Sequence, residues 1–214
     1  MKPVCLVTGA GGRLGQDLCH ALADEYELVV TYRSHPPSVP GMLVQADLGC
    51  RDGIAHVVDA AMARHGRVDA LVNSAADIRF HGSLRNLWPD ADYAQSQLLL
   101  NAIVPMQIAS KLYHDCWRDH PDDNVRWNRS VINVSSISGL TVFKDRGQAL
   151  YGVSKAALNM LTLYLSLEFA PCGVRVNAVC PSQFQDAAAT RRVTESIREL
   201  LGSTATGAIV TGIP

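Results

Sequence analysis

The sequence predicts a three-layer α/β/α fold, in which a doubly wound parallel sheet is covered by helices on both faces. Short apolar runs rich in strand-forming residues alternate with helical patterns along the chain. A glycine-rich turn separates the first apolar run from the first helical pattern, and no repeat or low-complexity linker interrupts the 214 residues. Strands that alternate with helices pair in parallel through right-handed crossovers. The chain, which is 48% hydrophobic, is therefore expected to form one domain over residues 1–214.

Each strand of the expected sheet is an apolar run that ends in a turn or loop. The strands are predicted at about 3–7, 27–32, 42–46, 68–73, 130–135 and 174–180. Helices are predicted to begin near Leu14, Asp52, Leu84 or Tyr93, Tyr151 and Thr190. A further helix pattern covers 193–201, and residues 211–214 resemble the start of a last strand. The mixed run 113–120 is interpreted as a solvated helix end.

The first turn has the composition of a dinucleotide-binding site. Residues 8–15 read Thr-Gly-Ala-Gly-Gly-Arg-Leu-Gly, between a strand and a helix. Glycines let the backbone approach a pyrophosphate, and a helix N-terminus offers unpaired N–H groups and partial positive charge. Gly9, Arg13, Leu14 and Gly15 are therefore candidate cofactor contacts in a Rossmann-type unit.

The end of the second predicted strand indicates which cofactor this is. Arg33 and Ser34 follow that strand, and no acid stands between Glu27 and Asp47. An acidic residue at this point binds the free ribose 2′-hydroxyl of NAD, whereas an arginine suits the 2′-phosphate of NADP. The sequence therefore predicts NADP(H), with Arg33 and Ser34 near the phosphate.

Tyr151 and Lys155 are candidate catalytic residues because they stand four residues apart at the start of a helical pattern. This spacing places both side chains on one face of the helix. A free tyrosine has a pKa of ~10, too high for ready proton exchange at neutral pH. A lysine cation one turn away is expected to stabilise the phenolate and lower the tyrosine pKa.

With these motifs in order, the chain resembles the short-chain dehydrogenase/reductase family from Lys2 to about Pro181. The resemblance implies that Asp47, Leu48, Asn73 and Ala75 contact the adenosine part of the cofactor. It also implies that Ser136 stabilises the developing anion, and that Asn101 breaks a helix and supports a water chain to the lysine. The matching pieces are the glycine-rich turn, Asp47-Leu48, Asn73-Ser74-Ala75-Ala76, Asn101, Ser135-Ser136, Tyr151-x-x-x-Lys155 and Val176-Asn177-Ala178-Val179-Cys180-Pro181. Pro181 follows a strand, as Gly9 and Asp47 do, and all three are expected at one rim of the sheet.

Two departures from the family pattern leave the substrate open. Arg13 replaces the middle glycine of the usual turn, which resembles the pteridine reductases. Ser136, followed by Ile137-Ser138-Gly139, is instead the pattern of ordinary carbonyl reductases. Ser136 also lies about two residues further from Tyr151 than is usual, so Ser135 and Ser138 are the alternative hydroxyls, and Ser138 meets the usual spacing. We prefer Ser136, because Gly139 then stays in register and the extra residues fall in the loop at 143–147.

The region after Pro181 is shorter than the family pattern. The substrate-covering loop, around 182–192, is either truly short or incomplete in this sequence, and we favour the second alternative because such loops are mobile by function. The closing Asp-Gly-Gly is absent. The segment from Asp77 to His81 is expected to select the substrate, with Phe80 a candidate stacking partner.

The expected function is hydride transfer from NADPH to a C=O or C=N bond of a small molecule, with Tyr151 as general acid. The alternatives are a pteridine reductase and a non-catalytic NADP-sensing protein; a sugar-nucleotide epimerase is less favoured. A net charge of −1 gives no case for nucleic acid, and no apolar run approaches a membrane span of ~20 residues. Six scattered cysteines and dispersed histidines suggest no metal site and a reducing cytoplasm. A homodimer or homotetramer is expected from the family, with pairing through helices near 93–112 and 151–169.

Overall fold

The computed structural model describes residues 1–79, 82–86, 91–144, 146–182 and 186–213. Its centre is a parallel sheet of seven strands in the order β3-β2-β1-β4-β5-β6-β7. The predicted Rossmann-like α/β class is thus confirmed. The strands are β1 Val4–Thr8, β2 Glu27–Tyr32, β3 Met42–Gln45, β4 Ala70–Asn73, β5 Ser130–Val134, β6 Arg175–Val179 and β7 Ile209–Val210.

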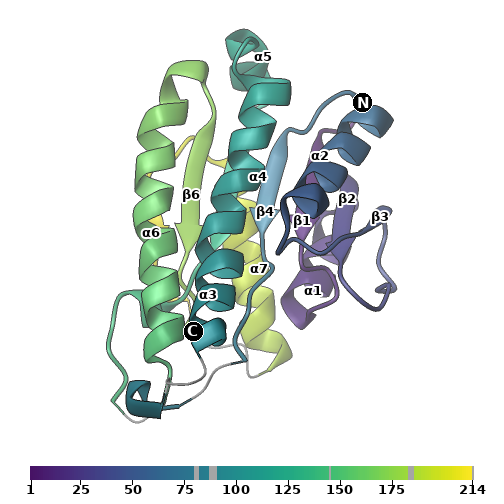
Figure 1. The fold of residues 1–214 in the computed structure, drawn as a ribbon. Helices are drawn as coiled ribbons and strands as arrows, with labels where there is room; N and C mark the ends of the chain where they lie inside the picture. Colours follow the sequence, from purple (N-terminus) through teal and green to yellow (C-terminus); the bar gives the residue numbers. More distant parts are fainter. Residues whose placement is uncertain (80–81, 87–90, 145, 183–185, 214) are drawn as a thin grey trace.

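Helices cover both faces of this sheet and make two separate cores (Figure 1). One core lies beneath α2, α4 and α6, and the other lies beneath α1 and α7. Successive strand residues serve opposite cores: Leu6 packs in the first, and Cys5 and Val7 pack in the second. Within the described ranges, no helix is both long and apolar enough to cross a membrane. The helices are α1 Arg13–Leu22, α2 Arg51–His65, α3 Ala91–Leu98, α4 Val104–Leu112, α5 Pro121–Arg126, α6 Ala149–Phe169 and α7 Ala187–Gly202.

Two predictions about local structure need correction. The last strand is Ile209–Val210, two residues before the predicted start, because these β-branched residues pair with Ala178 and Val179 of β6. The run 113–120 is a helix end with mostly exposed residues, as predicted, but Cys116 and Trp117 within it are buried. A π-helical turn, η3 (Tyr113–Trp117), adds a residue to the helix and turns Trp117 into the core, where its indole N–H donates to the Val68 carbonyl at 2.8 Å.

Candidate active site

A cavity of about 780 Å³ lies along the rim where the strands end. Most of the residues predicted from the sequence meet there, although they come from five separate segments. One end of the lining includes Arg33 and Asp47, and the other includes Tyr151 and Lys155. The predicted residues in the lining are Gly9, Arg13, Leu14, Gly15, Arg33, Asp47, Leu48, Ala75, Tyr151 and Lys155.

The glycine-rich turn is shaped by close backbone contacts. Gly9 has φ +76°, and a Cβ at this position would lie 2.7 Å from Ala75 Cα. A Cβ on Gly15 would collide with the Gly9 carbonyl oxygen. By contrast, the space beside Gly11 is open. Helix α1 begins at Arg13, and no side chain caps its first backbone N–H groups. Because the first residues of α1 line the cavity, this helix N-terminus fits the pyrophosphate of a dinucleotide.

The hydroxyl of Thr8 connects this turn to the neighbouring strand end. Its Oγ1 accepts hydrogen bonds from the backbone N–H groups of Ser74 and Ala75, both at 3.1 Å. Thr8 is buried at the end of β1, so the bonds hold the loop after β4 beside Gly9. The sequence reading missed this role, although Thr8 precedes Gly9 in the motif.

Tyr151, Lys155 and Ser136 form a contiguous group at the other end of the cavity. Tyr151 and Lys155 occupy the first two turns of α6, and the Lys155 ammonium lies 5.7 Å from the centre of the tyrosine ring. Ser136 caps the short helix η4 (Ile137–Gly139) and is hydrogen-bonded to the Tyr151 phenol. The hydroxyl of Ser138 instead donates to Gln148 at 3.4 Å. The Ser135 hydroxyl donates to the Lys155 carbonyl at 3.2 Å. Of the three candidate serines, the structure therefore brings Ser136 to the tyrosine.

The electrostatics of this group differ from the expectation. Burial raises the pKa of Tyr151, and the hydrogen bond that Ser136 donates offsets only part of this rise. The prediction that Lys155 lowers the tyrosine pKa is wrong for this geometry, because the ammonium turns toward the sheet and donates to the Val134 carbonyl at 2.8 Å. Burial lowers the pKa of Lys155 to about 8. Tyr151 is thus held in its protonated form at neutral pH.

Asn101 lies within a π-helical turn, η2 (Leu99–Ile103), that joins α3 to α4. Its side-chain oxygen accepts from the Asp77 backbone N–H at 2.6 Å, and its amide donates to the Asp77 carbonyl at 2.8 Å. The same amide nitrogen donates to Ser154 Oγ at 3.0 Å. The expected local break in the helix is therefore present, and its asparagine clamps the loop that follows β4.

Other predicted residues lie away from the cavity lining. Asn73 is buried within β4 and its side chain donates to Asn133 of β5 at 2.8 Å. Ser34 is exposed beyond the end of β2. Pro181 is buried, and its carbonyl accepts from Ile137 at 3.0 Å, which anchors η4. Phe80 falls outside the described residues, as does part of the loop expected at 182–192.

The sequence assigned the segment from Asp77 to His81 to substrate selection, but it did not single out the acid and the arginine within that segment. Asp77, Arg79 and Ser96 line the same cavity and bond to one another. The acid at the start of the segment after β4 was a signal, because buried acids need partners. Its partner Arg79, two residues later, could not be paired with it from sequence alone.

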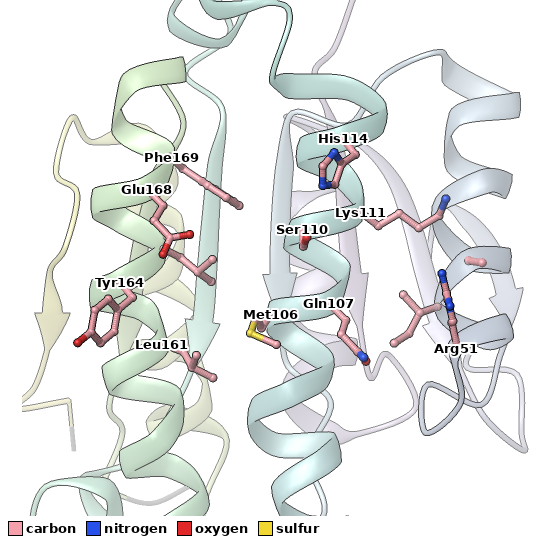
Figure 2. A pocket seen from close by; sticks show the side chains of 13 residues that line it. Arg51, Met106, Gln107, Ser110, Lys111, His114, Leu161, Tyr164, Glu168 and Phe169 are labelled. Carbon is pink, nitrogen blue, oxygen red and sulfur yellow. The ribbon is translucent and has the colours of Figure 1, made fainter.

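A second cavity, of about 720 Å³, lies on the outer side of the helical layer between α2, α4 and α6. Figure 2 shows Met106 and Gln107 on one helix opposite Leu161 and Tyr164 on the other. It contains none of the predicted catalytic or cofactor residues.

Comparisons with known proteins place this arrangement in a family. A family model described as "Enoyl-(Acyl carrier protein) reductase" matches residues 18–209. The 3-oxoacyl-[acyl-carrier-protein] reductase FabG of Thermotoga maritima is 27% identical over 214 residues, covering 92% of this chain and 79% of the relative. The 7alpha-hydroxysteroid dehydrogenase of Bacteroides fragilis is 28% identical over 151 residues, 70% of this chain and 55% of the relative. The chain thus spans about half the length of that second relative.

Solved structures show the same fold at low identity. A 3-ketoacyl-(acyl-carrier-protein) reductase from Brucella melitensis complexed with NADH has a TM-score of 0.86 and 20% identity, covering 97% of this chain and 95% of its own. An NAD+-bound xylitol dehydrogenase has a TM-score of 0.84 and 20% identity, covering 97% and 96%. Because the family model spans most of the sequence, the chain belongs to the short-chain dehydrogenase/reductase family of oxidoreductases.

Proposed function

We propose that this protein is an NADPH-dependent reductase that transfers a hydride to a C=O or C=N bond of a small molecule. One observation carries the proposal: a single cavity is lined by the glycine-rich turn, by Arg33 and by the pair Tyr151 and Lys155. This places a phosphate-binding helix terminus and a buried proton donor along one dinucleotide-sized groove. The name of the Thermotoga relative, a 3-oxoacyl reductase, supports a carbonyl substrate.

The choice of NADP(H) rests on the end of β2. Arg33 lines the cavity there. Among the described residues that line this end of the cavity, the acid nearest to Arg33 in the sequence is Asp47, fourteen residues later (47 − 33). An arginine fork matches a 2′-phosphate. We expect kcat/KM to be higher with NADPH than with NADH, and Arg33→Met to remove most of that preference. Arg118→Met, which removes an exposed arginine beside Asp119, is the control. A wild-type enzyme that prefers NADH would refute the assignment.

The residues of the chain have distinct roles in this proposal. The turn and α1 would hold the pyrophosphate, Asp47 and Leu48 the adenine side, and Lys155 the ribose nearest Tyr151. The nicotinamide supplies the hydride when bound. Tyr151 donates its phenolic proton to the oxygen or nitrogen on which charge develops, and Ser136 donates a hydrogen bond to the same atom. The raised pKa of Tyr151 suits the reductive direction, because the phenol remains protonated at neutral pH.

A variant without the phenolic hydroxyl distinguishes the proposed enzyme from a non-catalytic NADP-sensing protein. Tyr151→Phe keeps the ring and its packing while it deletes the proton donor. We expect NADPH oxidation to fall by at least about 100-fold, in line with the usual contribution of a general acid, while the Kd for NADPH stays nearly unchanged. Ser136→Ala should lower the rate more than Ser138→Ala. An unchanged rate for Tyr151→Phe would remove the mechanism.

The substrate class divides into two candidates on two residues. Arg13 lines the cavity and favours a dihydropterin, whereas Ser136 beside Tyr151 favours an ordinary ketone. A panel of ketones and dihydropterins, followed by NADPH absorbance, decides between them. Arg13→Gly, which restores the usual turn, should reduce turnover of a dihydropterin and spare that of a ketone if the first candidate is right.

We also propose that two or four copies assemble through the helical face that carries the second cavity. The outer side of α6 exposes large apolar side chains, including Met160 at 55% and Leu167 at 73%. Apolar surface of this kind on a helix face marks protein contacts. Light scattering after gel filtration should show a dimer or tetramer, and Leu167→Glu should lower the mass. Val125→Glu, at an equally exposed position on α5, is the control.

The proposed compartment is the cytoplasm. All six cysteines are free thiols, and five of them are buried. Burial raises the pKa of Cys19 to about 12, so this thiol stays protonated and unreactive. Unpaired cysteines at this density suit a reducing environment. Fractionation of the producing cells would test the assignment.

A further inference from the structure

The catalytic half of the main cavity carries a charged cluster of Asp77, Arg79 and Ser96, all in its lining. The Arg79 Nε lies 3.0 and 3.1 Å from the two Asp77 carboxylate oxygens, and its Nη2 lies 2.5 Å from Oδ2. The Ser96 hydroxyl donates to Oδ2 at 3.0 Å, and the Arg79 backbone N–H donates to Oδ1 at 2.9 Å. The guanidinium therefore has a fixed orientation.

A chain of hydrogen bonds connects this cluster to the catalytic tyrosine. Asn101 clamps the Asp77 backbone through both its N–H and its carbonyl, and it donates to Ser154 at 3.0 Å. The Ser154 hydroxyl donates to the Tyr151 carbonyl at 2.7 Å. Arg79 therefore belongs to the end of the cavity that holds Tyr151, opposite the end that holds Arg33.

The two partners of the ion pair differ greatly in exposure. The Asp77 side chain is 2% exposed, whereas the Arg79 side chain is 57% exposed. A half-exposed ion pair contributes little to stability, and burying a carboxylate is costly. Stability therefore does not explain this ion pair, but the binding of a ligand does, because Asp77 holds the arginine in position.

The free part of the guanidinium defines what that ligand must offer. Asp77 occupies the side formed by Nε and Nη2, and within the described residues no hydrogen bond or ion pair engages Nη1. The Nη2 nitrogen also lies 3.5 Å from Ser96 Oγ, at the outer limit of a hydrogen bond. Nη1, with its N–H donors, is thus the part of the guanidinium left for a ligand, and a charged N–H donor of this kind pairs with a carboxylate oxygen.

We propose that Arg79 is a specificity residue that binds a carboxylate carried by the substrate beside the bond that is reduced. The inference rests on the proposed function, since it assigns Tyr151 to that bond. Asp77 and Ser96 are positioning residues, because they hold the guanidinium through hydrogen bonds. The preferred substrates are then oxo acids rather than plain ketones.

Two compounds of equal size test this preference. 3-Oxobutanoate and 4-methyl-2-pentanone have nearly the same shape, and a carboxylate in the first replaces an isopropyl group in the second. We expect wild-type kcat/KM to be higher for the oxo acid. Arg79→Met should lower kcat/KM for the oxo acid by about 10- to 100-fold, the usual effect of a lost charged hydrogen bond, and change that for the ketone by less than about twofold.

Controls separate recognition from folding and from cofactor binding. Since Arg79→Met leaves Asp77 buried without its partner, the double variant Asp77→Asn/Arg79→Met provides the same test with no unpaired charge. Arg118→Met is the matched control, because that arginine is 49% exposed and bonds Asp119 through its Nε. The Kd for NADPH should be unchanged in all three variants.

Several results would overturn the inference. Equal losses for both compounds would show a general effect on the site, and no loss for either would show that Arg79 does not contact the substrate. A weakened Kd for NADPH would assign Arg79 to the cofactor. If none of the carbonyl compounds tested supports NADPH oxidation by the wild-type protein, the proposed function fails. Calorimetric binding of 3-oxobutanoate to the NADP+ complex of Tyr151→Phe then tests Arg79 alone, and an affinity unaffected by Arg79→Met refutes its role.

Discussion

The buried ammonium of Lys155 should destabilise the folded protein, and replacing it should make the protein more stable near neutral pH. Burial lowers the pKa of Lys155 from 10.5 to about 8. At about 1.4 kcal/mol per pKa unit, holding the charged form in the fold costs about 3 kcal/mol at pH 7. Lys155→Met keeps a long apolar stem and removes this charge, but it also removes the bond to the Val134 carbonyl, worth about 2 kcal/mol.

The dependence on pH isolates the charge from the packing. Between pH 8 and 10.5 the unfolded chain binds a proton at Lys155 that the folded protein does not bind, so wild-type stability rises with pH through this window. The methionine variant lacks this rise. The stability of Lys155→Met minus that of wild type should therefore fall by about 2 kcal/mol from pH 7 to pH 10. Packing and the lost hydrogen bond contribute equally at every pH and cancel.

Urea unfolding at several pH values measures this difference, and Lys111→Met provides a control of opposite sign. Hydrogen bonds to Asp115 and Asp59 raise the pKa of Lys111. The stability that Lys111 contributes is fully present below the pKa of this lysine in the unfolded chain, and it is lost as the pH rises through the pKa in the folded protein. The stability that Lys111→Met loses relative to wild type should therefore become smaller as the pH rises. A stability difference for Lys155→Met that does not change with pH would refute the reasoning, because the lysine would then titrate alike in both states.

Three further substitutions test the frame around the site. Asp69→Ala should destabilise the fold by about 3 to 5 kcal/mol in urea unfolding, because it leaves the buried guanidinium of Arg129, bonded to it at 3.0 Å, without a carboxylate; a loss below about 1 kcal/mol would contradict this. Gly9→Ala should weaken NADPH binding at least tenfold in fluorescence titration, since φ +76° and Ala75 oppose the new methyl group; an unchanged Kd would count against the turn. Asp77 has a pKa of about 2, lowered chiefly by the Arg79 hydrogen bond, so Asp77→Asn should reduce the stability lost between pH 4 and pH 2; an identical acid transition would contradict the pairing.

The general layout of the site was predictable because parallel strands all end at the same rim. Gly9, Arg33 and Asp47 each follow a strand in the sequence, and the structure brings all three to one cavity. The same rule was not sufficient for Asn73. This residue is the last of its strand, and its side chain turns toward Asn133 on the neighbouring strand. Position at a strand end predicts the rim but not the direction of the side chain.

The charge state of the catalytic pair could not be predicted from spacing. Four residues on a helix place Tyr151 and Lys155 on one face, as the structure shows. Whether the ammonium lowers the tyrosine pKa depends on burial and on where Nζ points, and both are set by the strand beneath the helix. The Val134 carbonyl takes the ammonium, and burial then dominates both pKa values.

Among the described residues, buried charged side chains lie around the main cavity and at the opposite end of the sheet, where Asp69 meets Arg129 and the Arg175 guanidinium donates to several carbonyls. The pair Asp69 and Arg129 is fully enclosed and matched, so its function is to join strands. In the part of the chain that the structure describes, Lys155 has no carboxylate partner within bonding distance, and no hydrogen bond engages Nη1 of Arg79. A cation buried with only a carbonyl for a partner lowers stability, and a fold selected for stability alone would carry methionine or leucine there. The retention of charge at Lys155 is therefore the strongest physical reason to regard this rim as the place where the chemistry occurs.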